Sequence, residues 1–234
     1  MRGVFLKTTD NYIVKIASIA KLDFVIIDLE HGISSLKDVK NHILSSTRST
    51  KVYVRVNNPN SENITQITEL SPDGLVIPNI QDYNQWKELK SRLYFYPKGK
   101  RGVCRFVPAA NFGELDSKKY FTQENDQKHI VQIEGGKALD QIEMFLNDDD
   151  ISTIFIGPYD LSQHFGVPGE IFHPKVIQCI ERITKLGKIN NKGLGIFVDN
   201  STLIKKFELL GFNFIACSVD YNLLLEAFKE IKKQ

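Results

Sequence analysis

The chain has 234 residues, 25% of them charged and 42% hydrophobic, and its formal net charge is +2. This composition is typical of a soluble globular protein, and so small a net charge excludes the strongly basic surface that nucleic-acid binding needs. The longest apolar runs fall well short of the roughly 20 residues that span a bilayer.

Short apolar runs alternate with amphipathic segments along the whole chain. The runs are continuous rather than alternating, which is typical of parallel strands covered on both faces. Helical periodicity appears between them, for example over residues 10–20, 140–146, 174–186 and 222–231. The predicted strands are residues 4–6, 24–28, 52–56, 74–78, 129–134, 153–156, 193–198 and 214–218.

Strands alternating with helices over this length predict a single (β/α)8 barrel of the TIM type, covering residues 1–234. An open, doubly wound sheet is the alternative, but the chain has neither the G-x-G-x-x-G fingerprint nor the phosphate loop G-x-x-x-x-G-K-[ST]. Residues 96–128 show little periodicity, and a loop of such length is usually functional or disordered. We expect it to lie over the barrel mouth, between the fourth and fifth strands.

Cysteine usage and the N-terminus indicate the compartment. The three cysteines, Cys104, Cys179 and Cys217, cannot all pair and lack the spacing of a metal site. The N-terminus becomes polar too soon for a signal peptide. We therefore predict a cytoplasmic protein that binds neither nucleic acid nor membrane.

Two carboxylates follow consecutive predicted strands. Glu134 ends the fifth strand, and Asp160 follows the sixth strand after Gly157, Pro158 and Tyr159. Acids at the carboxyl ends of neighbouring parallel strands can share one hard cation, and an all-oxygen ligand set favours Mg²⁺ or Mn²⁺ over a structural zinc ion. The alternative is a pair of ion-paired surface residues.

Four more polar residues follow the second and third strands. Asp28 and His31 are spaced so that the carboxylate could orient the imidazole for proton transfer, although such a histidine could also cap a helix. Glu30 could bind a water at the metal or hold a neighbouring arginine. Arg55 ends an apolar strand and needs an anion there, either a substrate oxygen or the carboxylate of Asp28 or Glu30.

Seven stretches, in order along nearly the whole chain, resemble the HpcH/HpaI aldolase family of metal-dependent class II pyruvate aldolases, which is related to citrate lyase. They are Asp28-Leu29-Glu30-His31-Gly32, Val54-Arg55, Leu75-Val76-Ile77-Pro78, Arg101-Gly102-Val103, Val131-Gln132-Ile133-Glu134, and residues 155–162 and 214–220. The resemblance implies a barrel of the phosphoenolpyruvate/pyruvate-binding type. It also implies a homohexamer of dimers that exchange their last helix, residues 222–231.

By this resemblance, Glu134 and Asp160 hold Mg²⁺ or Mn²⁺, with Co²⁺ as a further option. A 2-oxo acid such as pyruvate binds there, its carboxylate held by backbone N–H groups around residues 157–160, which include Gly157, Pro158 and Tyr159. Arg55 stabilises the enolate oxygen. His31, oriented by Asp28, moves protons, and Glu30 contributes to the substrate site. The enolate then attacks an aldehyde, or the reverse cleavage releases one.

The chain departs from the family pattern at three places. It starts almost at the first strand, where relatives carry a leading helix. Gly135-Gly136 follows the metal-binding glutamate, and residues 105–113, expected to face the aldehyde, vary in composition. Three alternatives remain open: a carbon–carbon lyase for an acyl-CoA ester, a Schiff-base aldolase using Lys7, and a barrel that binds a 2-oxo acid or sugar acid without turnover.

Overall fold

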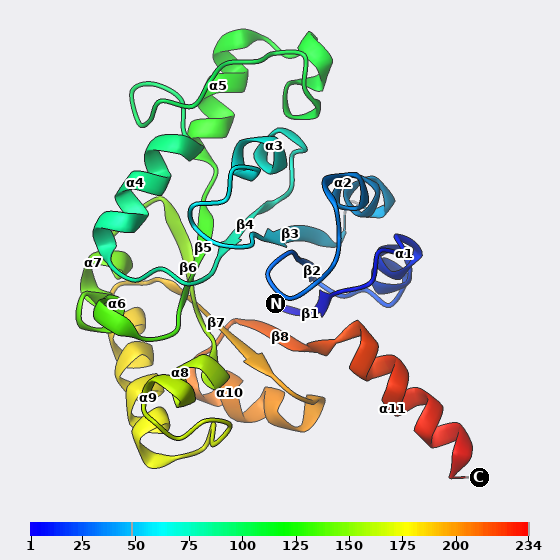
Figure 1. Ribbon diagram of the computed structural model, residues 1–234, viewed down its shortest axis with the longest axis vertical. Helices are drawn as coiled ribbons and strands as arrows, with labels where there is room; N and C mark the ends of the chain where they lie inside the picture. The colour runs from blue at the N-terminus through cyan, green and yellow to red at the C-terminus, as the bar shows by residue number, and fades with distance from the viewer. Residues whose placement is uncertain (48, 234) are drawn as a thin grey trace.

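Parallel strands form a closed barrel in a computed structural model that describes residues 1–47 and 49–233 (Figure 1). The eight strands of the described residues are neighbours in chain order, and the last pairs with the first. Their bounds are β1 (Arg2–Leu6), β2 (Phe24–Asp28), β3 (Lys51–Arg55), β4 (Gly74–Ile77), β5 (His129–Ile133), β6 (Ile151–Ile156), β7 (Gly193–Val198) and β8 (Phe214–Val219). The predicted barrel is confirmed, and the predicted strand bounds lie within two residues of these.

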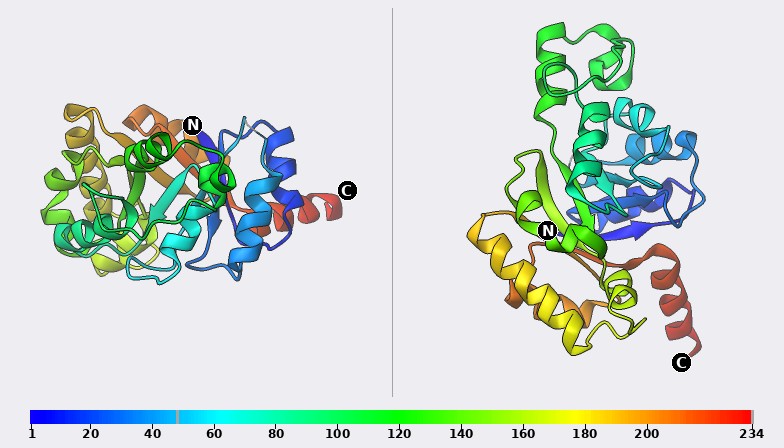
Figure 2. Two further views of the ribbon diagram at one scale, coloured as in Figure 1. Left: turned by 90° about the horizontal axis from the view of Figure 1, so that it is seen from above. Right: turned by 60° about the vertical axis from the view of Figure 1, so that its left-hand side comes forward.

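Helices connect the strands and surround the barrel (Figure 2). They begin at local signals: Ser35 and Asp38 form a reciprocal capping box at the start of α2, and Pro174 occupies the first turn of α9. The helices are α1 (Tyr12–Ile19), α2 (Leu36–Ser45), α3 (Ile64–Glu69), α4 (Tyr83–Leu93), η1 (Pro108–Gly113), α5 (Ser117–Asp126), α6 (Gly136–Asp140), α7 (Ile142–Leu146), α8 (Pro158–His164), α9 (Pro174–Ile189), η2 (Ser201–Leu203), α10 (Ile204–Leu210) and α11 (Asp220–Lys232).

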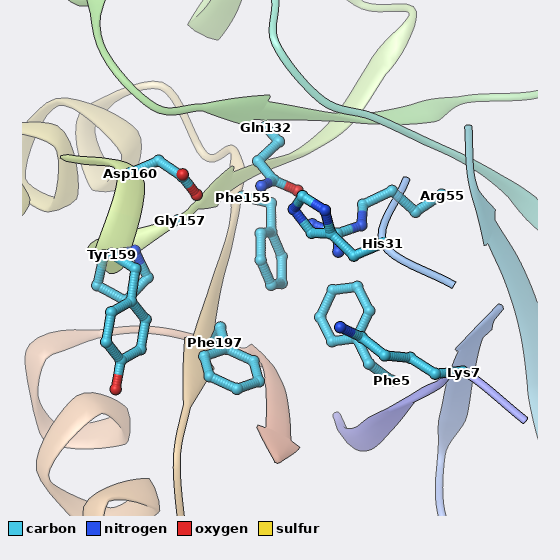
Figure 3. Close-up of a pocket in the computed structure, with 11 residues that line it drawn as sticks. Phe5, Lys7, His31, Arg55, Gln132, Phe155, Gly157, Tyr159, Asp160 and Phe197 are labelled. Atoms are coloured by element: carbon cyan, nitrogen blue, oxygen red, sulfur yellow. The ribbon is translucent and has the colours of Figure 1, made fainter. Parts of the chain in front are cut away.

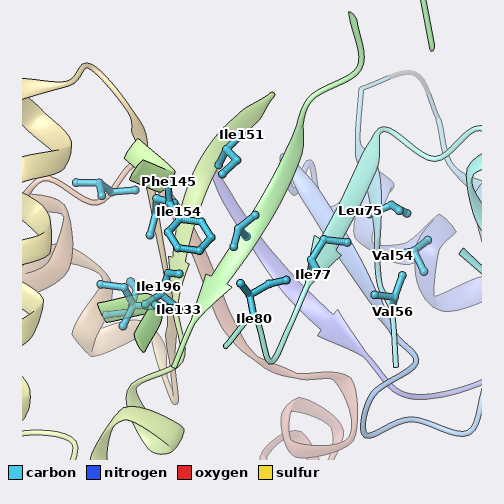
Figure 4. Close-up of a cluster of buried hydrophobic side chains, with 14 of the residues drawn as sticks. Val54, Val56, Leu75, Ile77, Ile80, Ile133, Phe145, Ile151, Ile154 and Ile196 are labelled. Carbon is cyan, nitrogen blue, oxygen red and sulfur yellow. The ribbon is translucent and has the colours of Figure 1, made fainter. Parts of the chain in front are cut away.

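The strands bury both of their faces, which explains their continuous apolar sequences. One face packs against the helices, with residues such as Val54, Leu75 and Ile154 in that layer (Figure 4). The other face fills the barrel interior, where the rings of Phe24 and Phe214 stack with centroids 3.8 Å apart. Because side chains alternate along a strand, two such layers require apolar residues at successive positions.

Residues 96–128 do not lie over the barrel mouth, and that prediction is wrong. The segment contains η1 and α5 and extends away from the barrel beside α4 (Figure 1). It contacts the amino ends of the strands, where Lys98 pairs with Asp150 just before β6. The segment follows a helix, and helix-to-strand connections in such barrels lie on the face opposite the mouth.

The last helix, α11, projects from the barrel (Figure 1). Its apolar residues are exposed, Phe228 by 64% and Ile231 by 73%. At its base, an apolar groove of about 270 Å³ lies against α1, with Leu6, Ile13 and Leu223 among its lining residues. Among the described residues, no helix combines the length and the apolar character needed to cross a membrane.

Candidate active site

A cavity of about 280 Å³ lies at the carboxyl ends of the strands and is lined by His31, Arg55 and Asp160 (Figure 3). Of the other residues expected to carry the chemistry, Glu134 lines an adjoining hollow together with Asn79 and Asp160, and Asp28 and Glu30 lie behind Arg55. Barrel enzymes place their sites at this end of the fold. The lining residues come from β1, β3, β5, β6, β7 and the segments that follow the strands: Phe5, Lys7, His31, Arg55, Gln132, Phe155, Gly157, Pro158, Tyr159, Asp160 and Phe197.

Glu134 and Asp160 converge around Gly157. A Cβ atom at Gly157 would lie 3.3 Å from Asp160 Oδ2, 3.4 Å from Glu134 Cγ and 3.2 Å from Gln132 Nε2. The amide of Gln132 donates to Glu134 Oε1, and the backbone N–H of Asn79 donates to Glu134 Oε2 at 2.9 Å. A side chain at position 157 would crowd this space, so glycine keeps the space between the two acids open.

The electrostatics of the two acids favour a bound cation. Burial raises the pKa of Glu134 to about 7, and the nearby charges of Asp160 and Glu30 add to that rise. Within residues 1–47 and 49–233, neither Glu134 nor Asp160 forms an ion pair, and no cluster of three or more His, Cys, Asp or Glu residues is arranged for a metal ion. A hard divalent ion fits two carboxylates whose remaining coordination positions are left to water and substrate.

Arg55 is held by two carboxylates at the edge of the cavity. Its Nε and Nη2 donate to the two oxygens of Asp28 at 2.9 and 2.8 Å, and its Nη1 lies 2.9 Å from Glu30 Oε2. Burial alone would raise the pKa of Asp28, but the hydrogen bonds and charge of Arg55 outweigh it and lower that pKa below its usual value. The expected contact of Arg55 with these acids is thus present.

Asp28 does not orient the imidazole of His31, and that expectation is corrected. Asp28 is fully buried and accepts from the backbone N–H groups of Glu30 and His31 at 3.1 and 3.3 Å, while its charge faces Arg55. The reason is register: Asp28 and Arg55 are partners across β2 and β3, so their side chains share one face. His31 lies beyond the strand end.

The imidazole of His31 is instead next to Glu30. Its side chain is 59% exposed, and Nε2 lies 3.8 Å from Glu30 Oε2. Burial raises the pKa of Glu30 to about 7, because the opposing charge of Arg55 does not fully compensate. His31 therefore reaches the cavity with a carboxylate beside it, but from a different residue than the sequence suggested.

Several residues of the site were not identified from the sequence. Asn79, just after β4, donates its side-chain amide to Glu30 Oε1 at 2.6 Å and its backbone N–H to Glu134, and so links the two acids. Asn79 adopts a left-handed φ of 55°, and asparagine is among the few residue types that tolerate it, so an asparagine directly after a predicted strand is the signal that the sequence offers. Gln132 is an isolated polar residue inside an apolar strand, which is also a detectable signal.

Three phenylalanines form the floor of the cavity, and Tyr159 forms one side (Figure 3). Phe5 packs edge-on against Phe155 and Phe197, each with centroids 6.0 Å apart. The hydroxyl of Tyr159 donates to Asp199 at 2.8 Å and points away from the cavity, so its ring is what lines the space. Tyr159 was expected at the substrate site, whereas the sequence shows the three phenylalanines as ordinary core residues, since only the barrel's curvature brings them together.

The closed barrel and the charged groups at its mouth define a barrel enzyme with its reactive residues at the carboxyl ends of the strands. The chain belongs to the HpcH/HpaI aldolase/citrate lyase family, whose model matches residues 2–227. This confirms the family that the sequence motifs indicated. Membership makes the protein a carbon–carbon lyase of the class II aldolase type, a class that generally depends on a divalent metal.

Relatives of known name support the assignment. The chain is 28% identical over 228 residues to a 2-keto-3-deoxy-L-rhamnonate aldolase of Klebsiella pneumoniae, with 96% of this chain and 85% of the relative covered. It is 29% identical to the protein of the same name from Salmonella dublin, with the same coverage. A solved structure of an HpcH/HpaI aldolase/citrate lyase family protein from Burkholderia cenocepacia has a TM-score of 0.93 and 25% identity, covering 100% of this chain and 93% of that chain.

Proposed function

We propose that the protein joins a pyruvate-like 2-oxo acid to an aldehyde, or cleaves the product, by forming an enolate at the barrel mouth. The observation that carries this proposal is the convergence of Glu134 and Asp160 around Gly157, because Gly157 and Asp160 line the same cavity as Arg55 and His31. Carbon–carbon bond formation next to a keto group needs an acidified C–H, a stabilised oxyanion and a group that moves protons. The cavity offers residues for each.

Glu134 and Asp160 are the proposed ligands of Mg²⁺ or Mn²⁺, with Co²⁺ as a further option. Such an ion would supply Lewis acidity at the keto oxygen. The carboxylate of the 2-oxo acid is proposed to bind next to Gly157, Pro158 and Tyr159, where α8 begins. The first backbone N–H groups of a helix have no partners within the helix and are available to an anion, although Pro158 has no N–H and can contribute only by contact.

Arg55 is proposed to stabilise the enolate oxygen. Because Asp28 and Glu30 hold the guanidinium in place, its charge is oriented before the reaction begins, which is what makes electrostatic stabilisation effective. His31 is proposed to take the C3 proton and to return one to the product alkoxide. Glu30, 3.8 Å from the imidazole, would stabilise the protonated form of His31. Asp28 acts through Arg55 and does not touch the substrate.

We also propose that residues 1–234 form one barrel domain that assembles as a cytoplasmic homohexamer of dimers exchanging α11. The exposed apolar side of α11 and the apolar groove beside α1 support the exchange, since a helix from a second copy would cover both. The free cysteines support the location. Replacing Leu224 and Phe228 together by aspartate should give a smaller particle by light scattering, and an unchanged mass would argue against exchange.

The test of the proposed chemistry uses pyruvate without an acceptor. We expect the protein with Mn²⁺ to exchange the methyl protons of pyruvate for solvent deuterium, as followed by NMR, and to lose this activity on chelation. Glu134→Gln should abolish the exchange, whereas Glu143→Gln, the same change at an exposed position of α7, should not alter it. Exchange that persists in EDTA and is trapped by borohydride would instead indicate a Schiff base. Complete absence of exchange would refute the proposed function.

A further inference from the structure

Lys7 is a cation in the active-site cavity for which the proposed chemistry has no use. It follows β1 directly, and β1 lies opposite β5 in the closed barrel. Its side chain therefore lies across the mouth from Glu134 and Asp160. Figure 3 shows its side chain extending toward the cavity. The side chain is 27% exposed, which leaves the ammonium group in reach of a ligand.

The hydrogen-bonding capacity of this ammonium group is unused. Lys7 Nζ lies 3.9 Å from Asp28 Oδ2, which is too long for a hydrogen bond, and that oxygen already accepts from Arg55 at 2.8 Å. Arg55 carries one positive charge but contacts two carboxylates, those of Asp28 and Glu30. Lys7 offsets the second negative charge by electrostatic attraction alone, without a hydrogen bond. Three N–H donors thus face the cavity, and Lys7 Nζ makes no hydrogen bond among residues 1–47 and 49–233.

The backbone of Lys7 is fixed from the other end of the chain. Asp220, which is 2% exposed at the start of α11, accepts from the backbone N–H groups of Lys7 at 3.1 Å and Thr8 at 2.9 Å. The hydroxyl of Tyr221 donates to the carbonyl oxygen of Lys7 at 3.2 Å. A lysine held at its backbone in this way is positioned to meet a ligand at a defined place.

The shape and charge of the cavity then indicate what Lys7 binds. The carboxylate and keto group of a 2-oxo acid belong at the Glu134–Asp160 side, and the apolar rings of Phe5, Phe155 and Phe197 separate that side from Lys7. A ligand that spans the cavity therefore places its far end at the ammonium group. Ammonium binds anionic oxygens best, through charge-assisted hydrogen bonds.

We propose that Lys7 is a specificity residue that binds a carboxylate on the acceptor half of the substrate, so that the enzyme prefers an aldehyde bearing an anionic group. This inference rests on the proposed function. In the aldol step, C3 of the 2-oxo acid loses a proton, a C3–C4 bond forms to the aldehyde carbon, and the resulting alkoxide takes up one proton. Lys7 forms no covalent bond and its charge does not change.

The experiment measures ligand binding and needs no turnover. Dissociation constants are measured by calorimetry on the Mn²⁺-loaded protein for 2-oxoglutarate and 2-oxoadipate, each compared with the uncharged-tail analogue, 2-oxopentanoate or 2-oxohexanoate. We expect at least one dicarboxylate to bind about 10- to 100-fold more tightly than its analogue. Lys7→Met should remove that preference, Lys7→Arg should retain part of it, and Lys15→Met, the same change at an exposed position of α1, should leave it intact.

The inference would be overturned by an unmodified protein with no preference for either dicarboxylate, or by a preference that survives Lys7→Met. Equal weakening of charged and uncharged ligands by Lys7→Met would also overturn it, because that pattern indicates a structural role. Exchange of pyruvate methyl protons by the unmodified protein reports separately on the proposed function. A failure of the aldolase chemistry is therefore distinguishable from a failure of the specificity assignment.

Discussion

The buried pair of Asp28 and Arg55 should make a large and coupled contribution to the free energy of unfolding. Asp28 is fully buried, and Arg55 gives it two hydrogen bonds at 2.9 and 2.8 Å. After Arg55→Met, the carboxylate retains two backbone N–H donors at 3.1 and 3.3 Å. Two lost hydrogen bonds to a charged group, at about 1.5–3 kcal/mol each, agree with the roughly 3–5 kcal/mol expected for breaking a buried pair.

The assay is urea unfolding of a double-mutant cycle. Arg55→Met should lower the free energy of unfolding by about 3–5 kcal/mol and Asp28→Asn should lower it by about 3 kcal/mol. The double variant should lower it by about 2–3 kcal/mol less than the sum of the two single effects. The exposed pair of Arg2 and Glu208, also 2.8 Å apart, is the matched control, and Arg2→Met should cost less than about 1 kcal/mol. Additive costs at Asp28 and Arg55, or a cost of Arg55→Met as small as that of Arg2→Met, would refute the pairing.

Two further predictions concern other parts of the barrel. Burial lowers the pKa of His129 to about 4, so between pH 6.5 and pH 4 the unfolded chain takes up a proton that the folded chain does not. The free energy of unfolding of the unmodified protein, compared with that of His129→Asn by urea titration, should therefore fall by about 3 kcal/mol from pH 7 to pH 4. Equal pH profiles of the two proteins would contradict this. Gly157→Ala should weaken Mn²⁺ binding about tenfold or more, because its Cβ would lie 3.3 Å from Asp160 Oδ2. The affinity is measured by paramagnetic-resonance titration, and an unchanged value would place the ion elsewhere.

Much of the fold and of the site could be predicted because the informative residues stand at the ends of buried strands. Each strand has to bury both faces, so its apolar run has clear limits, and the first polar residue after it falls at the barrel mouth. Glu134, Asp160 and Arg55 were found by that reasoning, and Arg55 and Asp160 line one cavity with Glu134 beside Gly157.

What could not be predicted depends on how neighbouring strands align. The sequence allows Asp28 to pair with Arg55 or to orient the imidazole of His31; the choice of Arg55 follows from the register of β2 against β3, which the sequences of the two strands do not specify. The position of residues 96–128 depends on where α4 ends, since a segment after a helix joins the opposite face from a segment after a strand. The sequence suggests Lys7 only as a covalent nucleophile, because the linear chain does not show that Lys7 lies across the barrel from the two acids.

Asp220 connects the first strand to the last helix through the N–H groups of Lys7 and Thr8. Any movement of the base of α11 is therefore transmitted directly to the backbone of Lys7. If neighbouring copies bind α11, the substrate preference set by Lys7 depends on the assembled particle. Dilution that dissociates the copies should then weaken this preference while the barrel is still folded.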